Sequence, residues 1–293
     1  MKISTDCNTT ISRYGHRRSL EMIKEAGFDG VDYTFYELPD DKNMLLLSDA
    51  RRIALAKELG EYIKELGLDI PQAHADFVGN RILREKPESF NYEFIWKSIE
   101  CAKLMGADQI VVHTLKCCDE MPEDEIVDIN VDFMTQLIPF AKEHNIKIGI
   151  ENLFKKNFDN GTYRGRQNTA ERMNSFIKKL NSDVFRVCCD LGHAAITGTE
   201  PEDFIRGMDA DLMTMIHVQD TDYKGDRHWL PYMGMQNWEE ICKALAEINF
   251  KGTMNIEVLH YYEQFDDNAI LPAMKLAANV ARYLAAKVES YKS

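Results

Sequence analysis

The sequence lacks any apolar run long enough to cross a membrane, and its first residues lack the features of a secretion signal. No stretch approaches the ~20 consecutive apolar residues that a membrane-spanning helix needs. The opening segment, MKISTDCN, has neither the basic start nor the apolar centre of a signal peptide. We therefore expect a soluble, cytoplasmic protein that has no membrane partner.

Cysteine is present, but not in the pattern of a disulfide scaffold or a zinc knuckle. The seven cysteines are an odd number and irregularly spaced, and no two of them form a CxxC pair. We expect reduced thiols that are mostly buried. Cys188 and Cys189 lie in a strand-like run, so their side chains should point to opposite faces, and we expect neither to bind a metal.

Basic residues are scarce relative to acidic ones. Lysine and arginine together number 35, aspartate and glutamate 48, and the formal net charge is −13. A field of this sign repels nucleic acids and acidic membrane surfaces. We therefore expect no nucleic-acid partner.

No low-complexity segment or linker rich in proline and glycine interrupts the 293 residues, which predicts a single domain over residues 1–293. Short apolar runs rich in β-branched residues alternate with longer amphipathic stretches. The short runs lack the polar–apolar alternation of a half-exposed sheet, as buried parallel strands do. They cover residues 2–7, 30–35, 69–77, 109–115, 147–153, 185–191, 213–220 and 253–259.

The intervening stretches carry apolar residues at three- and four-residue spacing, which is typical of amphipathic helices. Gly27, Gly67 and Gly106 follow three of them as C-caps, Ser48 is a suitable N-cap, and residues 122–145 form one predicted helical stretch. Eight strand–helix units predict an α/β fold, a single (β/α)8 TIM barrel. A doubly wound sheet is the alternative, although the sequence has no GxGxxG motif for a nucleotide.

Ionisable side chains gather where the predicted strands end. The carboxyl ends of barrel strands meet at one face, which is where TIM barrels carry their chemistry. From the third strand to the eighth, each strand ends with a side chain able to bind a metal, after apolar residues. These side chains are His74, His113, Glu151, Asp190 with His193, His217 with Asp220, and Glu257, and the loop after the seventh strand adds Asp226 and His228.

The most specific subset is Glu151, Asp190, His217 and Glu257. Three carboxylates and one imidazole are a mixed, mostly hard ligand set, which suits Mn²⁺, Mg²⁺, Co²⁺ or Zn²⁺. Three clustered carboxylates without a cation would repel one another and raise their own pKa values. We therefore predict one divalent metal ion as the cofactor.

The sequence resembles the xylose isomerase-like TIM-barrel superfamily. This group includes sugar isomerases and epimerases, inosose-processing enzymes and, as a more distant relative, endonuclease IV. The resemblance covers nearly the whole chain. Its motifs are GIEN at 149–152, CDLGH at 189–193, IHVQD at 216–220, DRHWLPYMG at 226–234 and NIEV at 255–258.

The resemblance implies a metal-dependent isomerase or epimerase acting on a sugar or sugar phosphate, with possible assembly into a homo-oligomer. The same four residues would hold the metal. The chemistry also fits the residues independently, because Glu151 and Glu257 could remove and return a proton next to a carbonyl while a metal stabilises the enediolate. We predict that these two glutamates are catalytic. The predicted substrate-binding residues are His74, His113, His193, Asp226, Arg227 and His228.

Two positions depart from the usual pattern of ketose 3-epimerases. Asn157 stands where those enzymes carry a second glutamate, and Tyr223 stands where they carry an arginine after the histidine ligand. Arg227 is a candidate replacement for that arginine. These departures favour a relative that acts on another carbohydrate.

Endonuclease IV, a zinc phosphodiesterase with three metal ions, is an alternative from another class. Its ligands are five histidines, two aspartates and two glutamates. Loops that grip DNA are rich in arginine and lysine, whereas residues 36–49 are acidic and apolar and residues 260–268 acidic and aromatic. The loops therefore favour a carbohydrate. The sequence nevertheless offers a candidate for every ligand: His74, His113, Glu151, Asp190, His193, His217, Asp226, His228 and Glu257.

A metal-dependent lyase or dehydratase is the other alternative. It would act on a keto-sugar, cyclitol or C-glycoside through the same enolate chemistry and then expel a leaving group, with His113 or His193 as acid or base. The loop after the fifth strand is basic. Its Lys155, Lys156, Arg164 and Arg166 either bind a sugar phosphate or belong to a solvated loop or a subunit contact.

Overall fold

Eight parallel strands form the centre of the computed structural model, which describes residues 1–77, 92–115, 121–156, 162–165 and 167–292. The strand order is β10-β1-β2-β3-β4-β5-β8-β9. A parallel bridge between Val218 and Ile256 joins the two ends of this order and closes the barrel. The strands are β1 (Ile3–Asp6), β2 (Gly30–Thr34), β3 (Asp69–His74), β4 (Gln109–Val112), β5 (Lys147–Glu151), β8 (Phe185–Asp190), β9 (Met213–His217) and β10 (Met254–Ile256).

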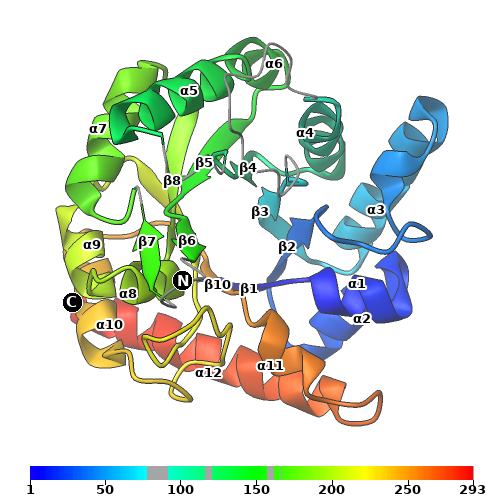
Figure 1. The fold of residues 1–293 in the computed structure, drawn as a ribbon. Helices are drawn as coiled ribbons and strands as arrows, with labels where there is room; N and C mark the ends of the chain where they lie inside the picture. Colours follow the sequence, from blue (N-terminus) through cyan, green and yellow to red (C-terminus); the bar gives the residue numbers. More distant parts are fainter. Residues whose placement is uncertain (78–91, 116–120, 157–161, 166, 293) are drawn as a thin grey trace.

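Helices surround the barrel (Figure 1). The predicted (β/α)8 barrel is therefore confirmed, and the closed strand order rules out a doubly wound open sheet. The helices are α1 (Asn8–Tyr14), α2 (His16–Ala26), α3 (Asp49–Glu65), α4 (Glu93–Met105), α5 (Glu123–Thr135), α6 (Ile138–Glu143), α7 (Ala170–Leu180), α8 (Leu191–Ile196), α9 (Pro201–Gly207), α10 (Trp238–Glu247), α11 (Leu259–Glu263) and α12 (Ile270–Tyr291), with a 3₁₀ turn at Met44–Leu46.

Local signals placed several helix ends correctly. Gly27 and Gly106 adopt the left-handed conformation after α2 and α4, with φ of 99° and 113°. Ser48 precedes α3, but its hydroxyl makes no capping hydrogen bond. The helical stretch predicted over residues 122–145 is two helices, because Pro139, which has no N–H to donate, lies in the first turn of α6.

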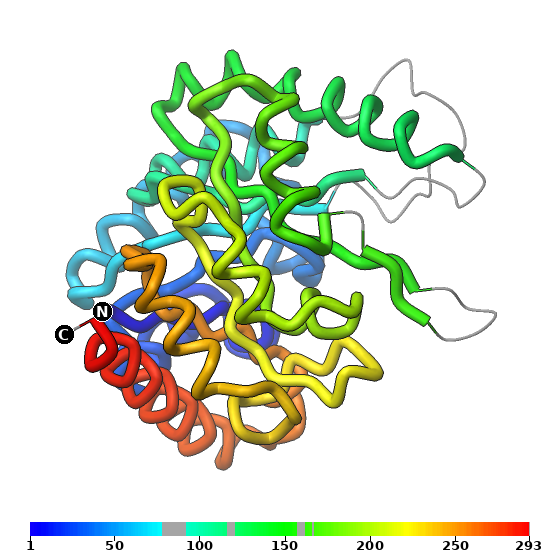
Figure 2. The backbone as a smooth tube through the Cα atoms, turned by 90° about the vertical axis from the view of Figure 1, so that its left-hand side faces the viewer, coloured from blue at the N-terminus to red at the C-terminus, as the bar shows by residue number. Residues whose placement is uncertain are grey.

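The predicted strands are longer than the observed ones at their carboxyl ends, where the chain leaves the sheet to form the barrel mouth. Short helices α1, α8 and α11 begin there and were not predicted. Neither was the antiparallel hairpin of β6 (Phe154–Lys156) and β7 (Tyr163–Gly165), which follows β5. Figure 2 shows this hairpin extending from the body, on the side opposite the two chain termini.

The interior of the barrel contains a small apolar layer beneath this mouth. Val111, Cys188 and Met215 pack together there, separately from the main core between strands and helices. Gly149 leaves room for Met215, because a Cβ at that position would lie 2.4 Å from the Met215 Cε atom. Cys189 belongs to the main core. The two neighbouring cysteines therefore face opposite sides of β8, as predicted.

Alternation along the strands then determines what lies above the apolar layer. Residues two apart on a strand point to the same face. The residues two positions after Val111, Gly149, Cys188 and Met215 are His113, Glu151, Asp190 and His217. The sequence thus directs these four side chains into the mouth of the barrel. In the described part of the chain, no helix has the length and apolar character that a membrane crossing requires.

Candidate metal centre and active site

A cavity of about 310 Å³ opens at the carboxyl ends of the strands. Its apolar and aromatic lining includes Tyr36, Phe77, Phe154 and Leu259. Seven of the predicted site residues also line it: His74, His113, Glu151, His193, Asp226, His228 and Glu257. Asp190 and His217 are fully buried next to these residues.

The four predicted metal ligands lie together. Glu151, Asp190, His217 and Glu257 each offer one ligand atom, and these atoms are all within 4.8 Å of one another. The Nδ1 atom of His217 lies 3.2 Å from Glu257 Oε2, 3.4 Å from Glu151 Oε1 and 3.9 Å from Asp190 Oδ2. The predicted juxtaposition of these side chains is therefore present.

The hydrogen bonding of this group fits a bound cation. Both ring nitrogens of His217 and Glu257 Oε2 are buried and have no hydrogen-bond partner among the described residues, which is costly for polar atoms unless a ligand satisfies them. Burial raises the pKa of Asp190 to about 6. Burial also disfavours the charged form of Glu151, but the neighbouring His217 and His113 outweigh it and hold its pKa well below the usual range. Carboxylates and an imidazole converging on one point are the donors that a divalent ion prefers.

Asp32 lies behind His217, on the far side from these carboxylates. Its Oδ2 atom is 3.5 Å from His217 Nε2, and it accepts hydrogen bonds from Gln72 Nε2 at 2.7 Å and Asn255 Nδ2 at 2.9 Å. Asp32 was not among the site residues predicted from the sequence. The signal was an acidic side chain within GVDYT, a strand in which every residue is buried.

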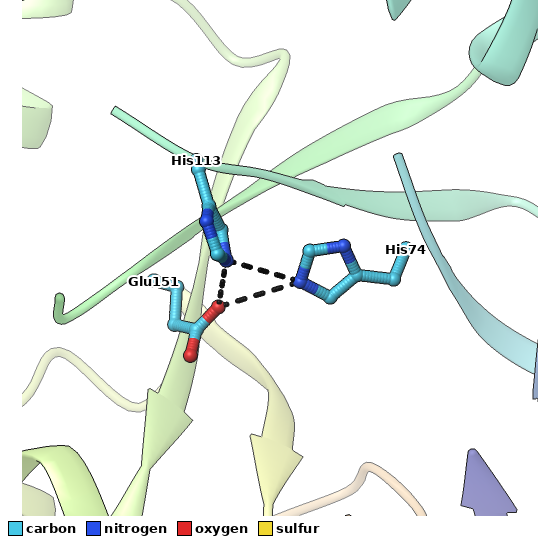
Figure 3. Close-up of side chains that lie close together, drawn as sticks. All are labelled: His74, His113 and Glu151. Atoms are coloured by element: carbon cyan, nitrogen blue, oxygen red, sulfur yellow. Dashed lines mark hydrogen bonds and ion pairs between the residues drawn. The ribbon is translucent and has the colours of Figure 1, made fainter. Parts of the chain in front are cut away.

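His74, His113 and Glu151 form a second group of possible metal ligands (Figure 3). The two Nε2 atoms are 3.1 Å apart, and His113 Nε2 lies 2.8 Å from Glu151 Oε2. His74 Nδ1 is 3.0 Å from the Ala75 carbonyl oxygen, which can only accept, so Nε2 of a neutral ring has its lone pair directed at the group. Burial lowers the pKa of His113 to about 4, which keeps that ring neutral and able to bind a metal.

His193, Asp226 and His228 form a third group. His228 Nε2 lies 3.2 Å from Asp226 Oδ2, and His193 Nε2 lies 3.6 Å from Asp226 Oδ1. Burial disfavours the charged form of His228, but Asp226 overcomes this and raises its pKa to about 10. His193 Nδ1 is also 3.0 Å from Glu151 Oε1, so Glu151 lies next to all three groups.

Gln219 connects the central group to the third one and was not predicted. Its Nε2 atom donates to Asp190 Oδ2 at 3.0 Å and to Asp226 Oδ1 at 3.1 Å. Its Oε1 atom accepts from the backbone N–H of His228 at 2.9 Å. This buried amide therefore fixes the position of the loop that carries Asp226 and His228.

Asp220, which sequence reasoning placed at the end of the seventh strand, holds the same loop from its other side. Its carboxylate accepts hydrogen bonds from the backbone N–H of Thr221, Tyr232 and Gln236 and from Trp238 Nε1, at 2.8–3.2 Å. The side chain is fully buried. Asp220 thus organises the loop.

Arg227 and Tyr223 both donate hydrogen bonds to neighbouring carboxylates. The Arg227 guanidinium donates to both oxygens of Asp222, at 3.1 and 2.9 Å, and lies over the ring of Trp229. The Tyr223 hydroxyl donates to Glu200 Oε2 at 2.7 Å. Asn157 and Arg166 lie outside the described residues.

A sequence model of the family described as xylose isomerase-like TIM barrel matches residues 20–286. The chain belongs to this family. Inosose isomerase of Bacillus subtilis is 24% identical over 96% of this chain and 98% of its own length. An uncharacterised protein of Methanocaldococcus jannaschii, MJ1311, is 28% identical over 82% of this chain and 78% of its own.

Several solved structures share the fold of this chain. A D-tagatose 3-epimerase-like protein has a TM-score of 0.73 and 22% identity, covering 98% of this chain and all of that one. The IOLI protein with a bound zinc atom has a TM-score of 0.73 and 20% identity, covering 100% and 99%. D-psicose 3-epimerase in the presence of D-fructose has a TM-score of 0.74 and 16% identity, covering both chains completely.

Proposed function

We propose that the protein is a divalent-metal-dependent isomerase or epimerase of a sugar or a related polyhydroxylated carbonyl compound. The observation that carries this proposal is that Glu151 and Glu257 are buried beside His217 in one ligand group and both line the same cavity. The inosose isomerase and sugar epimerases among the similar proteins support the reaction class. We also propose that the protein is cytoplasmic and forms a homo-oligomer.

The reaction requires a proton to leave a carbon next to a carbonyl and to return elsewhere or on another face. A divalent ion held by Glu151, Asp190, His217 and Glu257 would supply positive charge that stabilises negative charge developing on the substrate oxygens. One glutamate would accept the carbon-bound proton and the other would return it. Each carboxylate has two oxygens, so a single side chain can contact the cation with one oxygen and the substrate with the other.

The remaining polar side chains of the cavity would orient the substrate. His74 and His113 can each donate or accept a hydrogen bond, and Asp226 accepts, which suits the hydroxyl groups of a carbohydrate. Burial disfavours the charged rings of His193 and His228, but nearby carboxylates outweigh it and raise their pKa values, so these protonated rings would donate. Aromatic rings that line the cavity, such as Phe77 and Phe154, would contact its apolar faces. Arg227 would contact the substrate only after its guanidinium breaks its hydrogen bonds to Asp222.

Hydrogen–deuterium exchange tests this proposal. The metal-loaded protein is incubated in D₂O with a panel of ketoses, keto-glycosides and inososes, and deuterium at carbon is followed by NMR. We expect exchange with at least one substrate, and a loss of about 10²–10⁴-fold in its rate for Glu151→Gln or Glu257→Gln. Glu143→Gln, an exposed position on α6, is the matched control. Full exchange rates in both cavity variants would contradict the acid–base roles, and loss of a leaving group after exchange would identify the lyase instead.

A second candidate is a phosphodiesterase resembling endonuclease IV. The observation in its favour is that all nine residues proposed for three metal ions fall into three ligand groups, with Glu151 shared by two of them. Metal analysis of purified protein and an abasic-site DNA duplex distinguish the two functions. Three zinc ions per chain together with nicking of the duplex would favour the nuclease, whereas one ion and no nicking would favour the isomerase.

A further inference from the structure

A second cavity, of about 350 Å³, adjoins the cavity above the metal centre. The two share a wall formed by Thr114, Leu115, Leu153 and Phe154. The second cavity lies between hairpin β6–β7 and helices α5 and α7, from which Tyr163, Glu123 and Arg172 line it. A ligand long enough to pass the shared wall would therefore occupy both cavities.

The charged groups of the second cavity are mostly cationic. Among the residues that the structure describes, Lys155, Arg164 and Arg172 line it, against one carboxylate, Glu123. This balance is opposite to that of the whole chain, which has a net charge of −13. It is also opposite to that of the metal-site cavity, which contains the carboxylates of Glu151, Asp226 and Glu257.

The two arginines remain available to a ligand. The side chain of Arg164 is exposed and makes no hydrogen bond or ion pair with another residue that the structure describes. Arg172 Nη1 lies 3.3 Å from Asn168 Oδ1 and 3.5 Å from Glu123 Oε1. Both charged partners of that ion pair are about half exposed, so the pair is weak and water-screened.

The surroundings of Arg172 also favour an anion. Arg172 lies in the first turn of α7, whose positive end attracts negative charge. Gln167 and Asn168, just before this helix, line the same cavity, and Gln167 is 4% exposed. Their amides and the two guanidinium groups supply several hydrogen-bond donors within one cavity.

We propose that the second cavity binds a negatively charged group of the substrate, a phosphate or a carboxylate, while the carbonyl end of the same molecule lies in the metal-site cavity. This inference rests on the proposed function and narrows its substrate class. Arg164 and Arg172 are the specificity-determining residues. Their guanidinium groups match the two-oxygen geometry of phosphate and carboxylate.

Calorimetric titration of the metal-loaded protein with matched ligand pairs tests the proposal. The phosphate pair is D-fructose 6-phosphate and D-fructose, and the carboxylate pair is D-galacturonate and D-galactose. We expect the charged member of at least one pair to bind about 10- to 100-fold more tightly, the factor typical of charge-assisted hydrogen bonds. The pair with the larger difference identifies the anionic group.

Variants then locate the effect. Arg164→Ala and Arg172→Ala should each remove most of the difference within the favoured pair and leave binding of the neutral sugar unchanged. Glu123→Gln should increase the difference, because it removes a negative charge that opposes the anion. Lys178→Ala, on the same helix but outside both cavities, is the control for net charge.

The proposal is overturned if neutral and charged members of both pairs bind equally to the unmodified protein. It is also overturned if Lys178→Ala lowers the difference as much as the arginine variants do. The titration needs no turnover. Anion preference without hydrogen–deuterium exchange would therefore count against the proposed reaction but not against anion binding in this cavity. Exchange without anion preference would count against anion binding but not against the reaction.

Discussion

At the scale of single residues, the position of one imidazole organises the candidate metal centre. His217 directs Nδ1 toward three carboxylates and Nε2 toward Asp32. A carboxylate behind a metal-binding histidine fixes the ring orientation and the tautomer, and it increases the basicity of the other nitrogen. Asp32 itself accepts hydrogen bonds from Gln72 and Asn255, which hold its carboxylate behind the ring.

Asp32 therefore yields a prediction about metal affinity. Asp32→Asn keeps the shape of the side chain and removes its charge, and we expect metal to bind about 10- to 100-fold more weakly. Competition with a chelator measures the affinity, and thermal unfolding checks that the variant is folded. Asp40→Asn, in an exposed loop, is the control. An affinity equal to that of the control variant would show that Asp32 has only a packing role.

At the scale of elements, the segment after β9 explains how a loop presents two candidate ligands precisely. Asp220 accepts hydrogen bonds from four donors along residues 221–238, and Gln219 joins the same loop to Asp190. A loop held by buried hydrogen bonds from both sides can position Asp226 and His228 nearly as firmly as a strand does.

Replacing Asp220 should release this loop. Asp220→Ala leaves four buried or partly buried donors without their acceptor, and each such loss costs about 1–3 kcal/mol. We expect the free energy of unfolding to fall by at least about 3 kcal/mol, measured with urea. Asp222→Ala should change it by less than about 1 kcal/mol, because the ion pair of Asp222 with Arg227 is partly exposed to water. Equal losses in the two variants would contradict the anchoring role.

At the scale of the whole molecule, metal binding and folding should be coupled. Ligands from β5, β8, β9 and the end of β10 meet only when the barrel is closed, so a cation bound to them stabilises the folded state. At a free metal concentration of 100 times Kd, this stabilisation is about 2.7 kcal/mol.

Chelation should therefore lower the melting temperature of the protein. We expect a chelator to reduce Tm by several degrees, and Mn²⁺, Co²⁺ or Zn²⁺ added in excess to restore it. Glu257→Gln should make Tm much less sensitive to metal, whereas Glu143→Gln should respond like the unmodified protein. Differential scanning calorimetry provides the measurement. A Tm that changes with neither chelator nor added metal would contradict the presence of a metal centre.

Periodicity and strand-end chemistry were sufficient to predict the barrel and the location of the site. The apolar runs identified all eight strands, because each is buried on both faces. The ends of those runs contained Glu151 and His217, and the carboxyl ends of barrel strands meet at the mouth. The hairpin β6–β7 was not predicted, since its two strands are only three residues long and carry no apolar pattern.

The sequence by itself determined the order of the eight barrel strands, the layer of ionisable side chains at one end of the barrel, and the residue types able to bind a divalent ion. These depend on local spacing, which is readable along the chain. Only the tertiary structure shows that Asp32 lies behind His217, that Gln219 joins two ligand groups and that Arg227 pairs with Asp222. It also placed a cationic cavity beside an anionic one. Such contacts join residues from distant segments, and only closure of the barrel brings them within hydrogen-bonding distance.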